Sequence, residues 1–159
     1  MAVIRIRFVA DGSFVGRAIR WVTASLFQHV EFGTPEGTWI GAHIGGGIME
    51  RPADYAIEAR EYVYEIPCSD SQLVSLMIWA RSKVGTKYNT LDILGLLVKN
   101  RHFTTPHRYI CSQFCTEGLL WAFGASRVLN VLADYDDLIT PEILHLTPLI
   151  VGHRVKKVG

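Results

Sequence analysis

Four short runs of strand-forming residues fall within the first 66 positions, and most of them follow one another without a predicted crossover helix between them. Residues 3–9 and 61–66 alternate apolar with polar side chains, while the β-prone runs 29–32 and 38–43 flank a turn at 33–37 that contains proline and glycine. Strands that follow one another through turns pair antiparallel, because a parallel pair needs a long crossover. The order therefore predicts an α+β fold in which an antiparallel sheet packs against helices.

Capping residues and apolar spacing predict the helices. Ser13 is placed to cap a helix that extends to Phe27, and Ser69 with Gln72 has the spacing of a capping box before a helix that ends near Gly85. The apolar stripe of that second helix is interpreted as core and comprises Leu73, Leu76, Met77, Ala80 and Val84. The elements expected in the second half are helices over 90–98 and 111–123, a helix start at 140–142, and a closing strand within 149–158.

Composition limits the classes of protein to consider. The chain has 159 residues, of which 49% are hydrophobic and 19% charged, which excludes disorder and collagen and favours one domain over residues 1–159. Its formal net charge of +1 provides no overall field for a polyanion, so nucleic acid is not an expected partner.

No apolar run is long enough for a secretory signal or a membrane-spanning helix. Arg5 and Arg7 interrupt the N-terminal run, and the runs at 73–80 and 93–98 are short. We therefore expect a cytoplasmic protein without an integral membrane segment, encoded by a bacterium or a phage. The sequence gives no indication of an oligomeric state.

The three cysteines, Cys68, Cys111 and Cys115, are an odd number, so reduced thiols are expected rather than a disulfide framework. Cys111 stands where a strand-like approach meets a predicted helix. Backbone N–H groups and the helix dipole at such a position favour a thiolate, and the same N–H groups bind a developing oxyanion. Cys111 is therefore the candidate nucleophile, whereas Cys68 and Cys115 are interpreted as structural.

A thiolate nucleophile needs an imidazole as base and acid, together with a third group that fixes the imidazole tautomer. His29 opens one strand of the predicted hairpin and His43 ends the other, so the two rings are expected side by side. Glu31 shares the face of His29, because alternate residues of a strand point the same way. It is the second candidate for the orienting group.

A metal site formed by Cys111, Cys115 and a histidine is a weaker hypothesis. The spacing of the two cysteines places both sulfurs on one helical face, but a C-x3-C pair without a second clustered pair is a poor zinc signal. We expect neither a metal nor a cofactor.

Five motifs in order carry a resemblance to a known family. They are His-Val-Glu at 29–31, Trp-Ile-Gly-Ala-His-Ile-Gly-Gly-Gly-Ile at 39–48, Lys-Tyr-Asn at 87–89, Tyr-Ile-Cys-Ser-Gln-Phe at 109–114 and Thr-Pro-Glu-Ile-Leu at 140–144. Over residues 25–145 the chain resembles the permuted NlpC/P60 cysteine hydrolases of the YiiX/YebB type. The resemblance implies a circularly permuted papain-like fold, in which the histidine strand precedes the cysteine helix.

The resemblance also implies roles for particular residues. Cys111 is the nucleophile and His29 the base. His43 is the best match for the third triad residue, with Glu31 and Glu50 as alternatives. Gln28 stands where family members usually carry a small residue, and Tyr88 and Tyr109 are candidates for the pocket wall, with packing as their alternative role.

The implied activity is hydrolysis of an amide bond, of a peptide or cell-wall type, through a thioester intermediate on Cys111. Two alternatives stay open. The first is an acyltransferase or a lipid- or ester-directed thiol hydrolase of the same architecture, and the second is a papain-like module that binds a ligand without turnover. The expected partner is accordingly a small-molecule, peptide or acyl substrate.

Overall fold

A computed structural model describes residues 1–23, 25–55, 60–87, 110–124, 141, 144 and 154–158. The helices and strands of this part of the chain are β1 (Ala2–Ala10), α1 (Phe14–Thr23), β2 (His29–Gly33), β3 (Trp39–His43), β4 (Gly47–Arg51), β5 (Arg60–Cys68), α2 (Asp70–Ser82), α4 (Cys111–Phe123) and β6 (Arg154–Val158). The predicted helix over 90–98 and the residues Tyr88 and Tyr109 lie outside the described residues. No helix in the described part is both long and apolar enough to cross a membrane.

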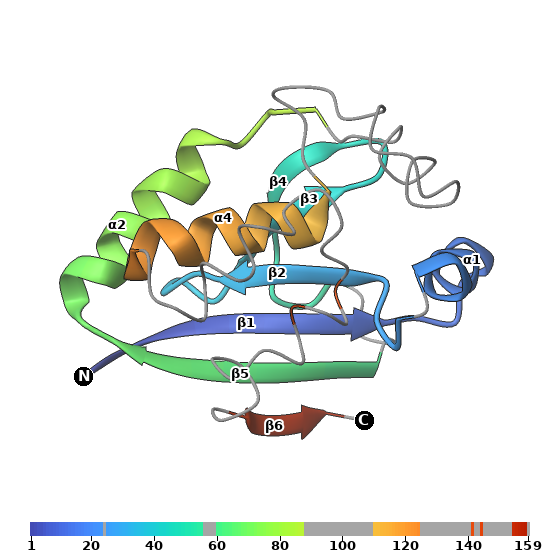
Figure 1. Cartoon of the computed structure of the whole chain (residues 1–159), viewed down its shortest axis with the longest axis horizontal. Coiled ribbons are helices and arrows are strands. Elements are labelled where there is room, and N and C mark those ends of the chain that lie inside the picture. The colour runs from blue at the N-terminus through green and yellow to red at the C-terminus, as the bar shows by residue number, and fades with distance from the viewer. Residues whose placement is uncertain are drawn as a thin grey trace.

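The strands form one sheet with the order β4-β3-β2-β1-β5-β6, and every neighbouring pair is antiparallel (Figure 1). The α+β class with an antiparallel sheet is thereby confirmed. The first strand lies inside the sheet, because β1 pairs with β2 on one side and with β5 on the other. Residues contributed early in the chain therefore stand at the centre of the molecule.

The two faces of the sheet differ in chemistry. One face is apolar and fully buried, and on β1 and β2 it consists of Ile4, Ile6, Phe8, Val30 and Phe32. The alternate residues of the same strands include two buried charged groups, Arg7 and Glu31, which the register places directly opposite each other. Charged groups are rarely buried without partners, so a functional site is expected on this second face.

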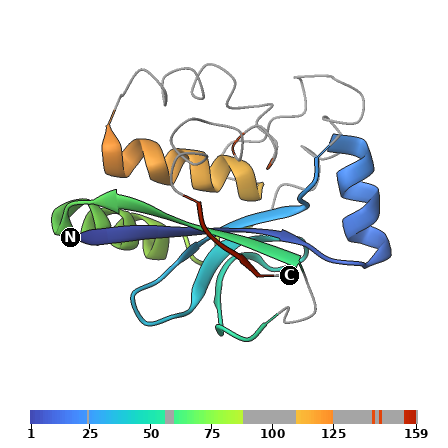
Figure 2. The same cartoon turned by 90° about the horizontal axis from the view of Figure 1, so that it is seen from below.

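Helix α4 lies across the apolar face, and α2 runs beside it, while α1 stands apart at one end of the sheet (Figures 1 and 2). Phe114 of α4 contacts Phe32 of β2 at a ring-centroid distance of 5.8 Å and stacks on Trp79 of α2 at 5.2 Å. A Cβ added at Gly118 would come within 2.6 Å of the Phe32 ring. Gly118 therefore lets α4 approach β2 closely, which sets the position of the helix start.

Local capping signals predicted the helix starts well. Ser69 accepts a hydrogen bond from the Gln72 backbone and Gln72 Oε1 accepts one from the Ser69 backbone, so the capping box of α2 is confirmed. Ser13 Oγ likewise accepts from the backbone N–H of Gly16 at 3.0 Å in α1. One core prediction is wrong, since Val84 follows the end of α2 and is exposed.

Two strands differ from the prediction. β4 was not predicted, because its sequence, Gly-Ile-Met-Glu-Arg, does not alternate and follows a run of glycines that reads as loop. The closing strand is found over Arg154–Val158, and the preceding part of the predicted range lies outside the described residues.

Candidate functional site

The β2–β3 hairpin brings two histidines together, as expected from their places at its open end. The rings of His29 and His43 have centroids 4.4 Å apart. Between the two strands, Gly41 faces Glu31, and a Cβ added at Gly41 would lie 2.7 Å from Glu31 Cβ and 3.2 Å from His29 Nε2. The hairpin thus leaves room for an imidazole and a carboxylate on one face.

Glu31 is the centre of the polar network, and its side chain is fully buried. One carboxylate oxygen, Oε1, accepts hydrogen bonds from Arg7, including one from Nε at 2.7 Å. The other, Oε2, accepts from the Tyr55 hydroxyl and lies 3.3 Å from His29 Nε2. His43 Nε2 is more distant, at 3.6 Å from Oε2, and forms no hydrogen bond with it.

Arg7 is held on several sides. Its guanidinium lies 4.2 Å from the centroid of the Trp39 ring and 4.7 Å from that of Tyr55, and its Nη1 donates to Glu61 at 2.9 Å. Planar stacking and paired N–H donors are the contacts that suit a buried guanidinium. Arg7 therefore provides a fixed positive charge that compensates Glu31.

Cys111 is the first residue of α4, whose N-cap residue is Ile110. The Ile110 side chain is apolar and makes no capping hydrogen bond, so it offers no acceptor to the backbone N–H groups at the start of α4. The Cys111 thiol is directed at the start of β2, with Sγ 3.9 Å from the carbonyl oxygen of Gln28, and its interaction with the neighbouring His29 contributes to the raised pKa of that histidine. His29 consequently lies between a thiol and a carboxylate.

Electrostatics favour the charged forms of His29 and Glu31. Burial alone disfavours protonation of His29, but the charge of Glu31 and the hydrogen bond with Cys111 outweigh it and raise the pKa of His29 from 6.5 to about 10. For Glu31, burial is again the opposing effect. The positive charges of His29 and Arg7 lower the pKa of Glu31 from 4.5 to about 2.

His43 behaves in the opposite way. Burial and then the positive charge of His29 lower the pKa of His43 to about 3, so this imidazole is neutral. Its Nε2 atom is buried and has no hydrogen-bond partner among the described residues. Tyr55, whose pKa is raised by burial and by Glu31, keeps its proton and donates a hydrogen bond to the Glu31 carboxylate.

The remaining candidates differ in where they lie. Gln28 lines the same cavity as His29 and His43, and its side chain accepts hydrogen bonds from the Asp11 backbone and from Arg20 Nη1, which ties α1 to the end of β1. Glu50 interacts with Thr38 and Arg81 and takes no part in the network of His29. Tyr88 and Tyr109 lie outside the described residues.

Like Cys111, the other two thiols are buried. Cys115 is fully buried, and burial raises its pKa well above the ordinary value. Burial, followed by the charge of Asp70, also raises the pKa of Cys68.

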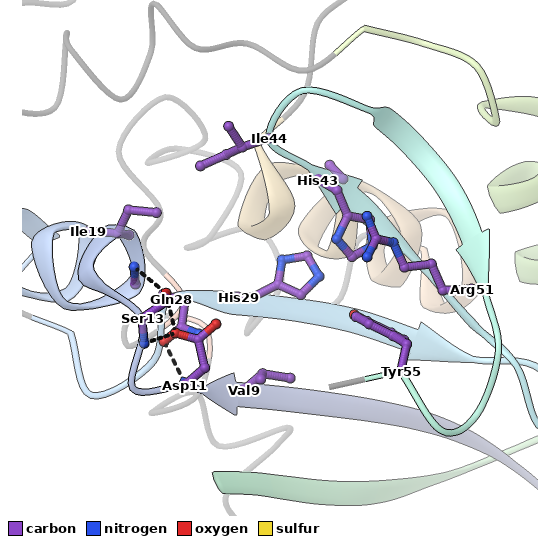
Figure 3. A pocket seen from close by; sticks show the side chains of 12 residues that line it. Val9, Asp11, Ser13, Ile19, Gln28, His29, His43, Ile44, Arg51 and Tyr55 are labelled. Atoms are coloured by element: carbon purple, nitrogen blue, oxygen red, sulfur yellow. Dashed lines mark hydrogen bonds between the residues drawn. The ribbon is translucent and has the colours of Figure 1, made fainter. Parts of the chain in front are cut away.

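A cavity of about 410 Å³ opens beside His29 and His43 (Figure 3). One wall comes from α1 and the segment before it, with Asp11, Ser13, Gly16 and Ile19, and the opposite wall from the β3–β4 hairpin and the segment that follows, with Ile44, Arg51 and Tyr55. The figure shows the His29 ring between these two walls. A substrate in this cavity would therefore meet the imidazole directly.

Sequence reasoning missed Arg7, Tyr55 and Arg51. Arg7 was interpreted only as a polar interruption of an apolar run, and its buried partner lies 24 residues away in sequence. The one available signal was its place on a strand opposite the face of Ile4 and Ile6.

One set of side chains in the described part of the chain has the composition of a metal site. His29, Glu31 and His43 each offer one donor atom, and these atoms lie within 4.8 Å of one another. The set differs from the Cys111 and Cys115 pair considered from sequence.

Comparison with known proteins finds similarity at the level of the fold. No family model matches the sequence, and no curated protein is significantly similar to it. Among solved structures, the chain is similar to the crystal structure of metalloprotein YiiX from Escherichia coli O157:H7, described as DUF1105, with a TM-score of 0.69 and 17% sequence identity over 99% of this chain and 97% of that one. The chain has the YiiX type of fold, in agreement with the resemblance of its motifs.

Proposed function

We propose that the chain is a cysteine hydrolase in which Cys111 is the nucleophile, His29 the general acid and base, and Glu31 the orienting group. The observation that carries the proposal is the position of His29, whose Nε2 lies 3.3 Å from the Glu31 carboxylate and whose pKa is raised by both Glu31 and Cys111. In this proposal residues 1–159 form one permuted papain-like domain. Glu31 takes the role that the resemblance gave first to His43, because Glu31 forms the hydrogen bond.

The geometry supports acyl transfer through a thioester. The Cys111 thiolate adds to an amide carbonyl carbon, N–H groups at the start of α4 stabilise the oxyanion, and protonated His29 gives its proton to the leaving amine as the C–N bond breaks. Water then attacks the thioester while neutral His29 takes its proton, which releases the acid and restores the thiolate. An amine or alcohol in place of water would give an acyltransferase.

Selective alkylation tests this proposal. Near pH 6.5, iodoacetamide should modify Cys111 at least about tenfold faster than Cys68 or Cys115, since only Cys111 is paired with an imidazolium. His29→Asn should remove most of the difference, and Cys68→Ala, the matched control, should leave the Cys111 rate unchanged. Peptide mapping by mass spectrometry gives the three rates.

A second measurement addresses turnover. Incubation with a mixed library of amides and esters should leave an acyl adduct on Cys111, detectable as a mass increase. Equal alkylation rates for the three thiols, with no adduct, would instead favour a binding module without catalysis.

Divalent-metal binding is a second candidate function. The neighbouring structure is described as a metalloprotein, and in this chain the buried His43 Nε2 lacks a hydrogen-bond partner among the described residues. Two imidazole nitrogens and a carboxylate oxygen are a donor set that zinc accepts, so the residues fit such an ion. A bound zinc would supply a Lewis acid.

The two candidates compete for one atom, because His29 Nε2 faces Glu31 and cannot both hold a proton there and donate its lone pair to a metal. Equilibrium dialysis against zinc, with elemental analysis, separates them. One zinc per chain, lost in His43→Asn, would support the metal site. If the native chain retains no zinc, the metal-site hypothesis is wrong and the cysteine-hydrolase proposal remains.

A further inference from the structure

The cavity beside His29 has one charged group that the proposed chemistry does not use. Arg51, at the end of β4, lines the wall opposite Asp11 (Figure 3). Its guanidinium lies 5.0 Å from the centroid of the Tyr55 ring, and its Nε donates to the Met49 sulfur at 3.1 Å. The side chain is half-buried, so part of its hydration has been removed.

Arg51 has no carboxylate partner among the described residues, unlike Arg7 and Arg81. Arg7 pairs with Glu31 and Glu61, and Arg81 pairs with Glu36 and Glu50. A partly desolvated guanidinium without an acidic neighbour gains strongly from binding an anion.

The acidic groups near the cavity are already engaged. Glu31 is compensated by Arg7 and capped by the Tyr55 hydroxyl. Asp11 Oδ1 accepts hydrogen bonds from the backbone N–H and the hydroxyl of Ser13, at 3.0 and 2.6 Å, and so belongs to the start of α1. The wall that contains Arg51 is therefore electropositive.

We infer that Arg51 is a specificity residue that binds a free carboxylate of the substrate, at a distance from the bond that Cys111 attacks. The inference rests on the proposed function for the identity of that bond. A carboxylate fits this site because one planar guanidinium, held against Tyr55, offers two parallel N–H donors to two oxygens. The substrate class is accordingly an amide whose acyl or amine portion ends in a carboxylate, such as a short peptide with a free C-terminus.

Matched alkylating probes test this directly. Bromoacetylglycine and bromoacetylglycinamide differ only in the charge of one end, and each reports the Cys111 alkylation rate. The ratio of the anionic to the neutral rate should fall at least about tenfold in Arg51→Gln, while the neutral rate changes less than about twofold. Arg51→Lys should keep part of the ratio.

Arg60→Gln is the matched control, since it removes the same charge from an exposed position at the start of β5. It should retain the ratio of the native chain. An unchanged ratio in Arg51→Gln, or an equal decrease in Arg60→Gln, would overturn the inference, because the effect would then be absent or due to net charge alone.

A binding measurement separates this inference from the proposed function. In Cys111→Ala, acetylglycine but not acetylglycinamide should shift the Arg51 Nε–H signal in a nitrogen-15 NMR titration. If Cys111 proves unreactive toward both probes while acetylglycine still binds, the hydrolase proposal fails and the carboxylate site stands. If acetylglycine does not perturb Arg51, the carboxylate site is refuted whatever the reactivity of Cys111.

Discussion

At the scale of single residues, two substitutions distinguish Glu31 from His43 as the third group of the proposed triad. Glu31→Gln removes the charge that raises the pKa of His29, so that pKa should fall by more than one unit and Cys111 alkylation should slow about tenfold. His43→Asn should leave the His29 pKa at or above its native value, because His43 is neutral. NMR titration of the His29 ring gives both values, and the reverse pattern would restore His43 to the orienting role.

Arg7 illustrates the cost of breaking a buried ion pair. Arg7→Met leaves the Glu31 carboxylate buried without its main counter-charge, which should lower the free energy of unfolding by about 3–5 kcal/mol. Arg81→Met, which breaks the exposed pairs with Glu36 and Glu50, is the control and should change the free energy of unfolding far less. Urea denaturation measures both. Similar decreases in the free energy of unfolding in the two variants would show that the buried Arg7–Glu31 pair matters no more to stability than an exposed pair.

At the scale of secondary structure, the β2–β3 hairpin holds the imidazole and the carboxylate in register. Gly41→Ala would place a methyl group against Glu31 and His29, so we expect about 1–3 kcal/mol of destabilisation and a tenfold or greater loss of Cys111 alkylation. Gly12→Ala, where an added Cβ meets nothing within 4 Å, should change neither quantity. Thermal melting and the Cys111 alkylation rate together check the prediction. A Gly41→Ala variant that is alkylated as fast as the native chain would contradict it.

The elements that were predicted correctly are those with local signals. The Ser69–Gln72 capping box predicted the start of α2 because both partners lie within one helical turn. The two histidines were predicted to meet because hairpin geometry depends on a short turn.

The parts that were missed depend on partners distant in sequence. Glu31 was placed second to His43, since nothing near it shows that Arg7 and Tyr55 will surround it. The carboxylate environment arises only when β1, β2 and the segment after β4 come together. Alternation along one strand cannot reveal which polar face will be buried.

For the whole molecule, the site should impose a maximum of stability near neutral pH. The lowered pKa values of Glu31 and His43 contribute stability above their ordinary values of 4.5 and 6.5, and it is lost as the pH falls toward about 2 and about 3. The raised pKa of His29 contributes stability below 6.5, and it is lost as the pH rises toward about 10.

Thermal melting across this pH range measures the effect. His29→Asn should flatten the alkaline decrease in Tm, because the group that releases its proton there is gone. An alkaline decrease of native size in this variant would assign the pH dependence to other groups.

The sheet order also has a consequence for how the molecule is made. The strand with His29 and Glu31 is synthesised early, whereas the helix with Cys111 emerges 82 residues after His29. A nascent chain halted between them has the imidazole and the carboxylate but lacks Cys111, so under the proposed function its site is incomplete on the ribosome. The proposed site is complete only when the late helix docks on the Phe32 side of the sheet, so the proposed reaction would depend on the completion of folding.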